Sequence, residues 1–218
     1  MKKDYINDIP KVERRYIDPL MEVRAGDGDN QQIRGIAAVV DKTTDLGFFE
    51  ERLSRGAFDN VLNDDVVALF NHDSNLPLAR TTAKNAGKLT LRINEDGHLA
   101  YSYPQPTTSI GKDLTENIRN EVIQHSSFAF TIAEEVWEFA SKENGREKDL
   151  RTITKIERLY DVSPVTYPAY NDTKVGVRNK ESLISDKEQA HNKNHQEIED
   201  YKREMQIVKI KSKIKVGK

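Results

Sequence analysis

The sequence contains no cysteine among its 218 residues. That absence excludes disulfide bonds, cysteine-ligated zinc and a thiol nucleophile together, so covalent catalysis would have to use a serine or a threonine. No apolar run approaches the ~20 residues of a membrane-spanning helix. No apolar segment follows the basic N-terminal residues, as a secretory signal would require. We therefore expect a protein that stays in the cytosol and has no membrane partner.

An excess of charge is also absent, because 34 basic residues stand against 36 acidic ones, for a net charge of −2. No overall field then favours nucleic acid as a partner. The segment Ile207–Lys218 is an exception, since it has five lysines and no acidic residue. It would support only salt-dependent, unspecific binding, so nucleic acid is not the expected partner.

Hydrophobic residues make up only 36% of the chain and charged residues 32%, a polar balance which indicates that part of the chain lies outside the core. Residues 1–15 are charged and aperiodic, which predicts a loose arm. Residues 176–218 predict a charged tail that is disordered or helical. Between them, residues 16–175 show strand-like runs separated by turn signals. The sequence predicts an α+β domain there, with a mostly antiparallel, β-barrel-like core and flanking helices.

Several local patterns give this domain its predicted elements. Asp96 and Gly97 lie between two strand-like runs and predict a hairpin. Residues 126–138 and 149–160 predict two long strands, with Pro164 and Pro168 ending the pairing after residue 165. Residues 55–62 predict a short helix. A longer helix is predicted after a cap at Thr108 or Ser109, with a core-facing stripe of Ile110, Leu114, Ile118 and Val122.

Ser127 begins a strand-like run in which successive side chains point to opposite faces. Phe128 and Phe130 share one face and should seek the core. Ser127 and Ala129 share the other, where small side chains leave room for a group to approach the hydroxyl. Ser126 lies on the phenylalanine face and is the poorer nucleophile. A strand serine is most often structural, and the residues alone leave that interpretation open.

His72 follows the apolar run Val66–Phe70, where a buried strand gives way to polar residues. An imidazole there can be anchored on one side and reach a cleft on the other, as a general base must. A structural histidine is the alternative. A metal site with Asp73 is not expected, because adjacent strand residues point apart and no further ligands accompany them. His125 shares the face of Ser127, but a separation of roughly 6–7 Å makes it a neighbour of the site and not the base.

Asp161 comes at the predicted end of a strand, after Leu159 and Tyr160. A carboxylate there could fix the tautomer of an imidazole and stabilise its charged form. A cap or turn aspartate before Pro164 is the alternative. Glu157 is a second acid, better explained as an exposed strand residue. An imidazole, a hydroxyl and a carboxylate from distant points of a chain are the three parts of acyl-transfer chemistry.

The segments around these residues resemble the prohead maturation proteases of tailed phages, which are serine proteases with a fold related to herpesvirus assemblin. The matching segments run in order across about residues 20–175. They are Glu22–Arg24, Arg34–Val39, Gly56–Phe58, Leu69–Asp73, Leu78–Arg80, Ser127–Phe130 and Leu159–Ala169.

The resemblance implies a herpesvirus-protease-like fold, and we expect neither a cofactor nor a metal. It implies Ser127 as the nucleophile and His72 as the base, and it gives the third role to Asp161, where family members often have Glu. Ala129 is a further difference, because the family often has Gly between the two phenylalanines. Serine should therefore be the nucleophile of this protein.

The implied function is that of a serine endopeptidase of phage capsid maturation. It would cleave the scaffold or the delta region of the major capsid protein, and itself, inside the immature capsid in the host cytoplasm. Those proteins are the implied partners, with self-association inside the procapsid. The alternative is a catalytically silent scaffold or assembly chaperone, but all three catalytic positions hold competent residues.

Overall fold

The computed structural model describes residues 12–17, 21–25 and 31–167, and in the C-terminal part residues 185, 188–189, 191–193, 196–197 and 199–205. Its elements, in chain order, are β1 (Glu13–Ile17), β2 (Met21–Ala25), β3 (Gln31–Ala38), β4 (Thr43–Asp45), β5 (Glu50–Leu53), β6 (Val67–Phe70), β7 (Asp73–Arg80), the 3₁₀ helix η1 (Asn85–Gly87), β8 (Thr90–Ile93), β9 (Leu99–Pro104), α1 (Ser109–Arg119), β10 (His125–Glu138) and β11 (Leu150–Val165).

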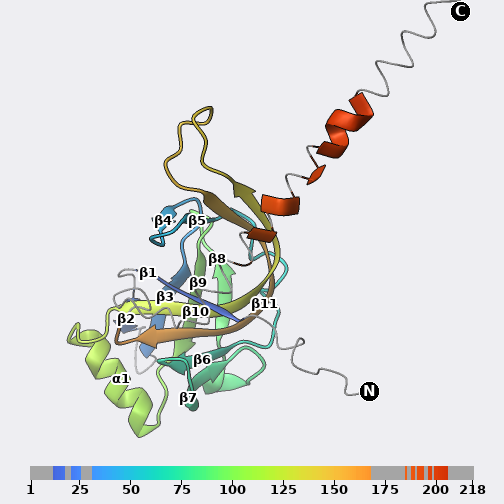
Figure 1. The fold of residues 1–218 in the computed structure, drawn as a ribbon. Helices are drawn as coiled ribbons and strands as arrows, with labels where there is room; N and C mark the ends of the chain where they lie inside the picture. The colour runs from blue at the N-terminus through green and yellow to red at the C-terminus, as the bar shows by residue number, and fades with distance from the viewer. Residues whose placement is uncertain are drawn as a thin grey trace, which may run out of the picture.

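The strands form two sheets (Figure 1). The larger has seven strands in the order β1-β10-β11-β5-β4, and β6 joins it by pairing with β11 and with β7. The smaller has the order β2-β3-β9-β8. Most pairs are antiparallel, while β5 and β6 both run parallel to β11. The predicted α+β class with mostly antiparallel strands is confirmed. Within the described residues neither sheet closes into a barrel, and the likeness to the herpesvirus protease stays a prediction.

The long antiparallel pair of β10 and β11 is the frame of the larger sheet. The two strands have 14 and 16 residues and pair along almost their whole length. The sequence predicted the second strand to residue 160 and the end of pairing after residue 165. β11 continues beyond residue 160, and it ends at Val165 as that second prediction has it. It continues because β10 pairs with one edge of this part and β6 with the other, at Asp161 and Val162.

The core fills the space between the sheets with apolar side chains of both. Phe128 and Phe130 are fully buried and stack with ring centroids 4.8 Å apart, as the alternation of β10 predicted. Phe58 and Phe128 pack in a T-shaped arrangement with ring centroids 5.6 Å apart. Tyr101 on β9 pairs with Gly35 on β3 and lies directly over it.

The helices differ in part from the prediction. Thr108 caps α1 by accepting a hydrogen bond from the Gly111 N–H at 3.2 Å, as expected. Of the four residues in the predicted stripe, Leu114 and Ile118 are buried, whereas Ile110 is exposed. The helix ends at Arg119, so Val122 lies beyond it and is also exposed. The short helix predicted at 55–62 is wrong. Residues 55–63 form consecutive turns, because Gly56 has a φ of +86°, which an α-helix does not contain. Within residues 31–167, α1 is the one α-helix.

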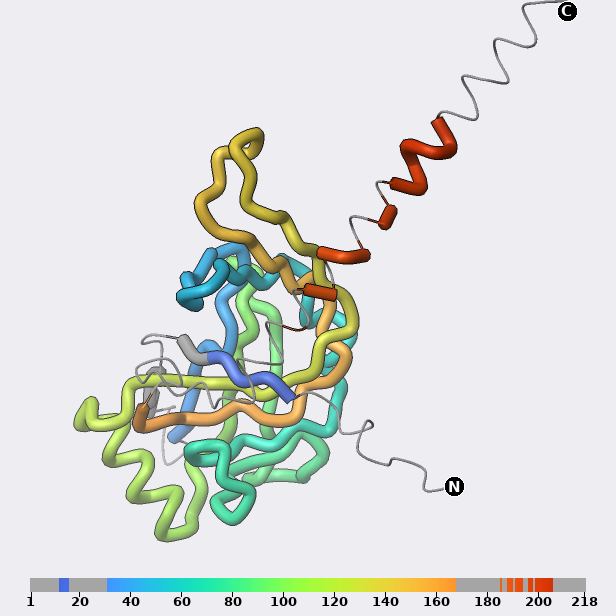
Figure 2. Tube along the Cα trace, viewed as in Figure 1, coloured from blue at the N-terminus to red at the C-terminus, as the bar shows by residue number. Residues whose placement is uncertain are grey.

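The ends of the described chain bear on the predicted arm and tail. Residues 13–15 of the predicted arm belong to β1 and pair with β10, whereas residues 1–11 lie outside the described part. The described residues between 185 and 205 are helical and mostly exposed, and they extend away from the sheets (Figure 2). Ring contact between Phe139 and His191, at 4.8 Å, joins the two parts. No described helix is long and apolar enough to cross a membrane. The domain boundaries stay predictions.

Replacing Gly35 by alanine should destabilise the fold by about 2 kcal/mol, because overpacking a closely packed site typically costs 1–3 kcal/mol. A Cβ at Gly35 would lie 2.5 Å from the ring of Tyr101, which cannot move within the core. Urea denaturation measures the change. Gly87→Ala is the control, since its Cβ would meet only the Ala83 methyl at an ordinary 3.4 Å. Equal stability of the two variants would contradict the close approach.

Candidate functional site

His72 lies in a two-residue turn between β6 and β7. Phe70 pairs with Asp73, and both connecting residues have positive φ, 55° for Asn71 and 57° for His72. Two left-handed residues are what a type I′ hairpin turn needs. Asparagine adopts this conformation easily, but for histidine it is a strained state that costs on the order of 1–2 kcal/mol. Such strain persists only where the surroundings hold the turn in place.

Asn71 holds this turn against the end of β11. Its backbone N–H donates to the Pro164 carbonyl at 3.0 Å, and its side-chain amide donates to the Thr166 hydroxyl at 3.2 Å. The Thr166 N–H donates back to the Asn71 side chain at 2.8 Å. The turn is therefore fixed beside β11, and the His72 side chain with it.

Ser127 and Asp161 lie on neighbouring strands of the same sheet. Ser127 is opposite Ser163, and Ala129 is opposite Asp161. Opposite residues share a face of the sheet, so all four side chains point to one side. The register shifts directly after the second pair, where Phe130 pairs with Leu159, and such bulges often re-aim side chains beside functional sites. Ala129 leaves the space opposite the carboxylate free of a large side chain.

The imidazole of His72 joins the other two predicted residues. Its Nδ1 lies 2.6 Å from Oδ1 of Asp161, and its Nε2 lies 2.7 Å from Oγ of Ser127. The Ser163 hydroxyl donates to the same Asp161 oxygen at 2.6 Å, which fixes the carboxylate. With Nδ1–H donating to Asp161, Nε2 is left as an acceptor for the serine proton. The arrangement can therefore deprotonate the hydroxyl and stabilise the resulting imidazolium.

The Ser127 hydroxyl has a second partner that the sequence did not indicate. It donates to the backbone carbonyl of Arg15 on β1 at 2.8 Å. Ser127 is only 1% exposed, and β1 pairs with its strand on the side away from β11. The hydroxyl thus lies between the imidazole and a neighbouring strand.

The other predicted candidates have different surroundings. Ser126 is buried and donates to the Tyr101 hydroxyl at 3.2 Å, on the opposite face from Ser127. Burial raises the pKa of that phenol to about 12. Oδ1 of Asp73 accepts hydrogen bonds from the backbone and side-chain nitrogens of Asn75, both at 2.8 Å, so this carboxylate bonds within its own strand. His125 begins β10 opposite Val165. Among the described residues, no group of three or more His, Cys, Asp or Glu could hold a metal ion.

A buried ionic cluster joins β1 to neighbouring strands of the larger sheet. It consists of Glu13, Arg15, Glu51, Glu135 and Arg151. Arg15 bonds both Glu13 and Glu51, with its Nη2 2.6 Å from Oε2 of Glu51. Arg151, almost fully buried, is 3.0 Å from Glu13, 3.2 Å from Glu51 and 2.5 Å from Glu135. Burial alone would raise the pKa of the Glu13 carboxyl, but Arg15 and Arg151 outweigh it and hold that pKa below its usual range. The two arginines thus keep the Glu13 carboxylate ionised, and the cluster ties β1 to β5 and β11.

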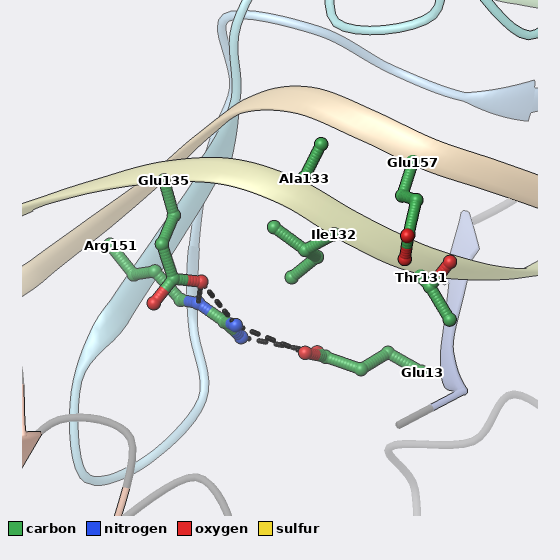
Figure 3. Close-up of a pocket in the computed structure, with 7 residues that line it drawn as sticks. All are labelled: Glu13, Thr131, Ile132, Ala133, Glu135, Arg151 and Glu157. Atoms are coloured by element: carbon green, nitrogen blue, oxygen red, sulfur yellow. Dashed lines mark hydrogen bonds and ion pairs between the residues drawn. The ribbon is translucent and has the colours of Figure 1, made fainter. Parts of the chain in front are cut away.

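A cavity of about 270 Å³ continues from this cluster along β10 (Figure 3). It is lined by Glu13, Thr131, Ile132, Ala133, Glu135, Arg151 and Glu157. Glu157, the alternative acid of the sequence, therefore faces this cavity and not the imidazole. Figure 3 shows the Arg151 guanidinium between Glu13 and Glu135 at one side of it.

The family described as caudovirus prohead serine protease matches residues 20–188. No curated protein matches the chain. The solved structure of the capsid assembly protease of bacteriophage T4 is similar at 11% sequence identity and a TM-score of 0.47, over 72% of this chain and 98% of that one.

The short contact between His72 and Asp161 should give a proton resonance well downfield of the amide region, because a proton shared between imidazole and carboxylate is strongly deshielded. A one-dimensional proton NMR spectrum of the protein checks this. The resonance should vanish in Asp161→Asn and in His72→Gln, but remain in Asp73→Asn. A resonance that survives Asp161→Asn would contradict the arrangement.

Proposed function

The chain belongs to the caudovirus prohead serine protease family, and from that membership we propose that Ser127, His72 and Asp161 carry out its peptide hydrolysis. The observation that supports this most is the single imidazole within 2.7 Å of both a hydroxyl and a carboxylate. Membership of the family makes the chain a protease of bacteriophage capsid maturation.

The proposed mechanism follows from the order of these hydrogen bonds. The Ser127 oxygen attacks the carbonyl carbon of the scissile peptide while Nε2 of His72 takes the hydroxyl proton. Asp161 stabilises the imidazolium that forms, and His72 then gives the proton to the leaving amine. A water molecule, deprotonated by the same imidazole, hydrolyses the acyl-enzyme and restores the serine. Ser163 acts as a positioning residue through its hydrogen bond to Asp161.

The proposed substrates are the scaffold or the delta region of the major capsid protein, and the protease itself. The family description supports a site of action inside the prohead, within the host cytoplasm. Enclosure there would bring copies of the chain together and make cleavage in trans between them frequent. A catalytically silent scaffold or chaperone is the other candidate, and three competent residues in one hydrogen-bonded chain favour the enzyme over it.

Ser127→Ala should abolish cleavage of the capsid protein while the fold is kept, since loss of a triad nucleophile typically costs on the order of 10⁴–10⁶ in rate. Co-expression with the major capsid protein of the same phage, followed by mass spectrometry of new termini, measures this. Ser126→Ala is the matched control and should remain active, because its hydroxyl contacts only the Tyr101 side of the sheet.

His72→Ala should be as severe as Ser127→Ala, and the double variant scarcely worse, because the members of one catalytic unit are not additive. Asp161→Asn should be milder than either. An inactive Ser126→Ala together with an active Ser127→Ala would contradict the assignment of the nucleophile. Full activity of Asp161→Asn would move the orienting role to another residue, with His125 the first to examine.

The C-terminal tail should be dispensable for catalysis and lost during maturation. Its described residues are mostly exposed and highly charged, so they add little to the core. The wild-type enzyme should therefore remove its own tail inside proheads, whereas Ser127→Ala should keep its full length. Mass spectrometry of particle-associated protease measures the difference. Intact 218-residue chains in mature, active particles would contradict self-cleavage.

A further inference from the structure

β1 occupies the edge of the strand that carries Ser127. β10 pairs with β11 on one side and with β1 on the other, where Tyr16 is opposite Ser127 and Arg15 is opposite Phe128. β1 is the outermost strand of its sheet, and it contributes only five residues (Figure 1). Without it, β10 would present a row of free backbone groups beside the nucleophile. Such an edge binds extended peptides by adding them as a further strand.

The Arg15 carbonyl competes with His72 for the serine proton. A hydroxyl has one proton to donate, and two acceptors lie within reach of Ser127, the Arg15 carbonyl at 2.8 Å and Nε2 of His72 at 2.7 Å. When the proton points to the carbonyl, the imidazole cannot accept it. General-base catalysis by His72 does not begin while the hydroxyl donates to the Arg15 carbonyl.

β1 also prevents a polypeptide from reaching the hydroxyl. Ser127 is 1% exposed, and a peptide bond has to come within van der Waals distance of its oxygen before attack. The backbone of β1 already places one carbonyl at hydrogen-bond distance from that oxygen. An extended strand with a carbonyl in front of the nucleophile has the chemistry of a bound peptide.

On the basis of the proposed function, we propose that β1 is an internal inhibitory strand. It occupies the edge of β10 where an extended polypeptide substrate binds antiparallel to the strand, and the substrate has to displace it. The enzyme exchanges between a closed state, in which the Arg15 carbonyl contacts Ser127, and an open state that accepts substrate.

The anchors of β1 allow this exchange. Arg15 holds β1 through Glu51, and Glu13 holds it through Arg151. After β1 leaves, Glu51 and Glu135 still pair with Arg151 at 3.2 Å and 2.5 Å. Displacement therefore leaves no buried charge without a partner, and the arginine and glutamate of β1 become hydrated.

The test compares Arg15→Gln with Arg14→Gln in the full-length protein, using cleavage of a free peptide that contains a mapped capsid site. Arg15→Gln removes the anchor at Glu51, whereas Arg14 is exposed on the same strand and serves as the control. Because β1 and the substrate compete, Arg15→Gln should lower KM about tenfold with kcat nearly unchanged. Arg14→Gln should match the wild type. An unchanged or higher KM in a folded Arg15→Gln protein would contradict the inhibitory role.

A second variant tests the same point without weakening the cluster. Ile17 is opposite Ser126, and paired strand residues lie close enough for a disulfide, so Ile17→Cys with Ser126→Cys would fix β1 to β10. The chain has no other cysteine to interfere. The oxidised protein should lose peptide cleavage at least tenfold relative to its reduced form, and dithiothreitol should restore it. Equal rates of the two forms would contradict the proposal.

Reaction with a small fluorophosphonate, which phosphonylates the nucleophile of serine hydrolases, tests the proposed function separately from the inhibitory role of β1. If neither the wild type nor Arg15→Gln cleaves peptide or reacts with the probe, the proposed function is contradicted, and the inhibitory role with it. A protein that reacts at Ser127 but shows wild-type KM in Arg15→Gln, and equal rates in the oxidised and reduced pair, would contradict the inhibitory role alone.

Discussion

The antiparallel register between β10 and β11 is the constraint on which the site depends. It sets Ser127 opposite Ser163 and Ala129 opposite Asp161, so that hydroxyl and carboxylate share one face. Side chains alternate along a strand, and a slip of one residue would turn either group to the other face. The same stretch of β11 pairs with β6, and β6 leads directly to the turn that carries His72. One segment of β11 thus positions both partners of the nucleophile.

The strained turn between β6 and β7 positions the His72 imidazole over this face of the sheet. A two-residue connection is the shortest that can return the chain from β6 to β7, and it projects the imidazole over the sheet face without a loop that could move. The left-handed conformation of His72 is unfavourable by itself. The bonds of Asn71 to Pro164 and Thr166 compensate for it by fixing the turn to β11. The unfavourable backbone conformation of His72 lowers the stability of the turn, but it keeps the imidazole in one position.

The sequence predicted what depends on local alternation and missed what depends on distant contacts. The choice of Ser127 over Ser126 followed from the period of two along β10, and the two hydroxyls do lie on opposite faces. Asp161 was expected at a strand end because the partner strand β6 cannot be inferred from the residues around it. The contact of Arg15 with Ser127 joins residues 112 positions apart, and a charged N-terminal segment carries no signal of it. The turn at His72 was also hidden, since it lacks the glycine typical of such turns.

The chemistry of the anchors distinguishes a permanent strand from a displaceable one. A strand fixed by apolar side chains would expose apolar surface on leaving, and the hydrophobic effect would oppose its release. Arg15 and Glu13 anchor β1 through ion pairs, and the charges of both regain full hydration in water. Buried ion pairs contribute little net stability, because desolvation offsets much of the attraction, but they demand a defined geometry. A cluster of this kind can hold β1 in one register beside Ser127 and still allow a substrate to displace the strand. That combination suits a strand whose place a substrate has to take.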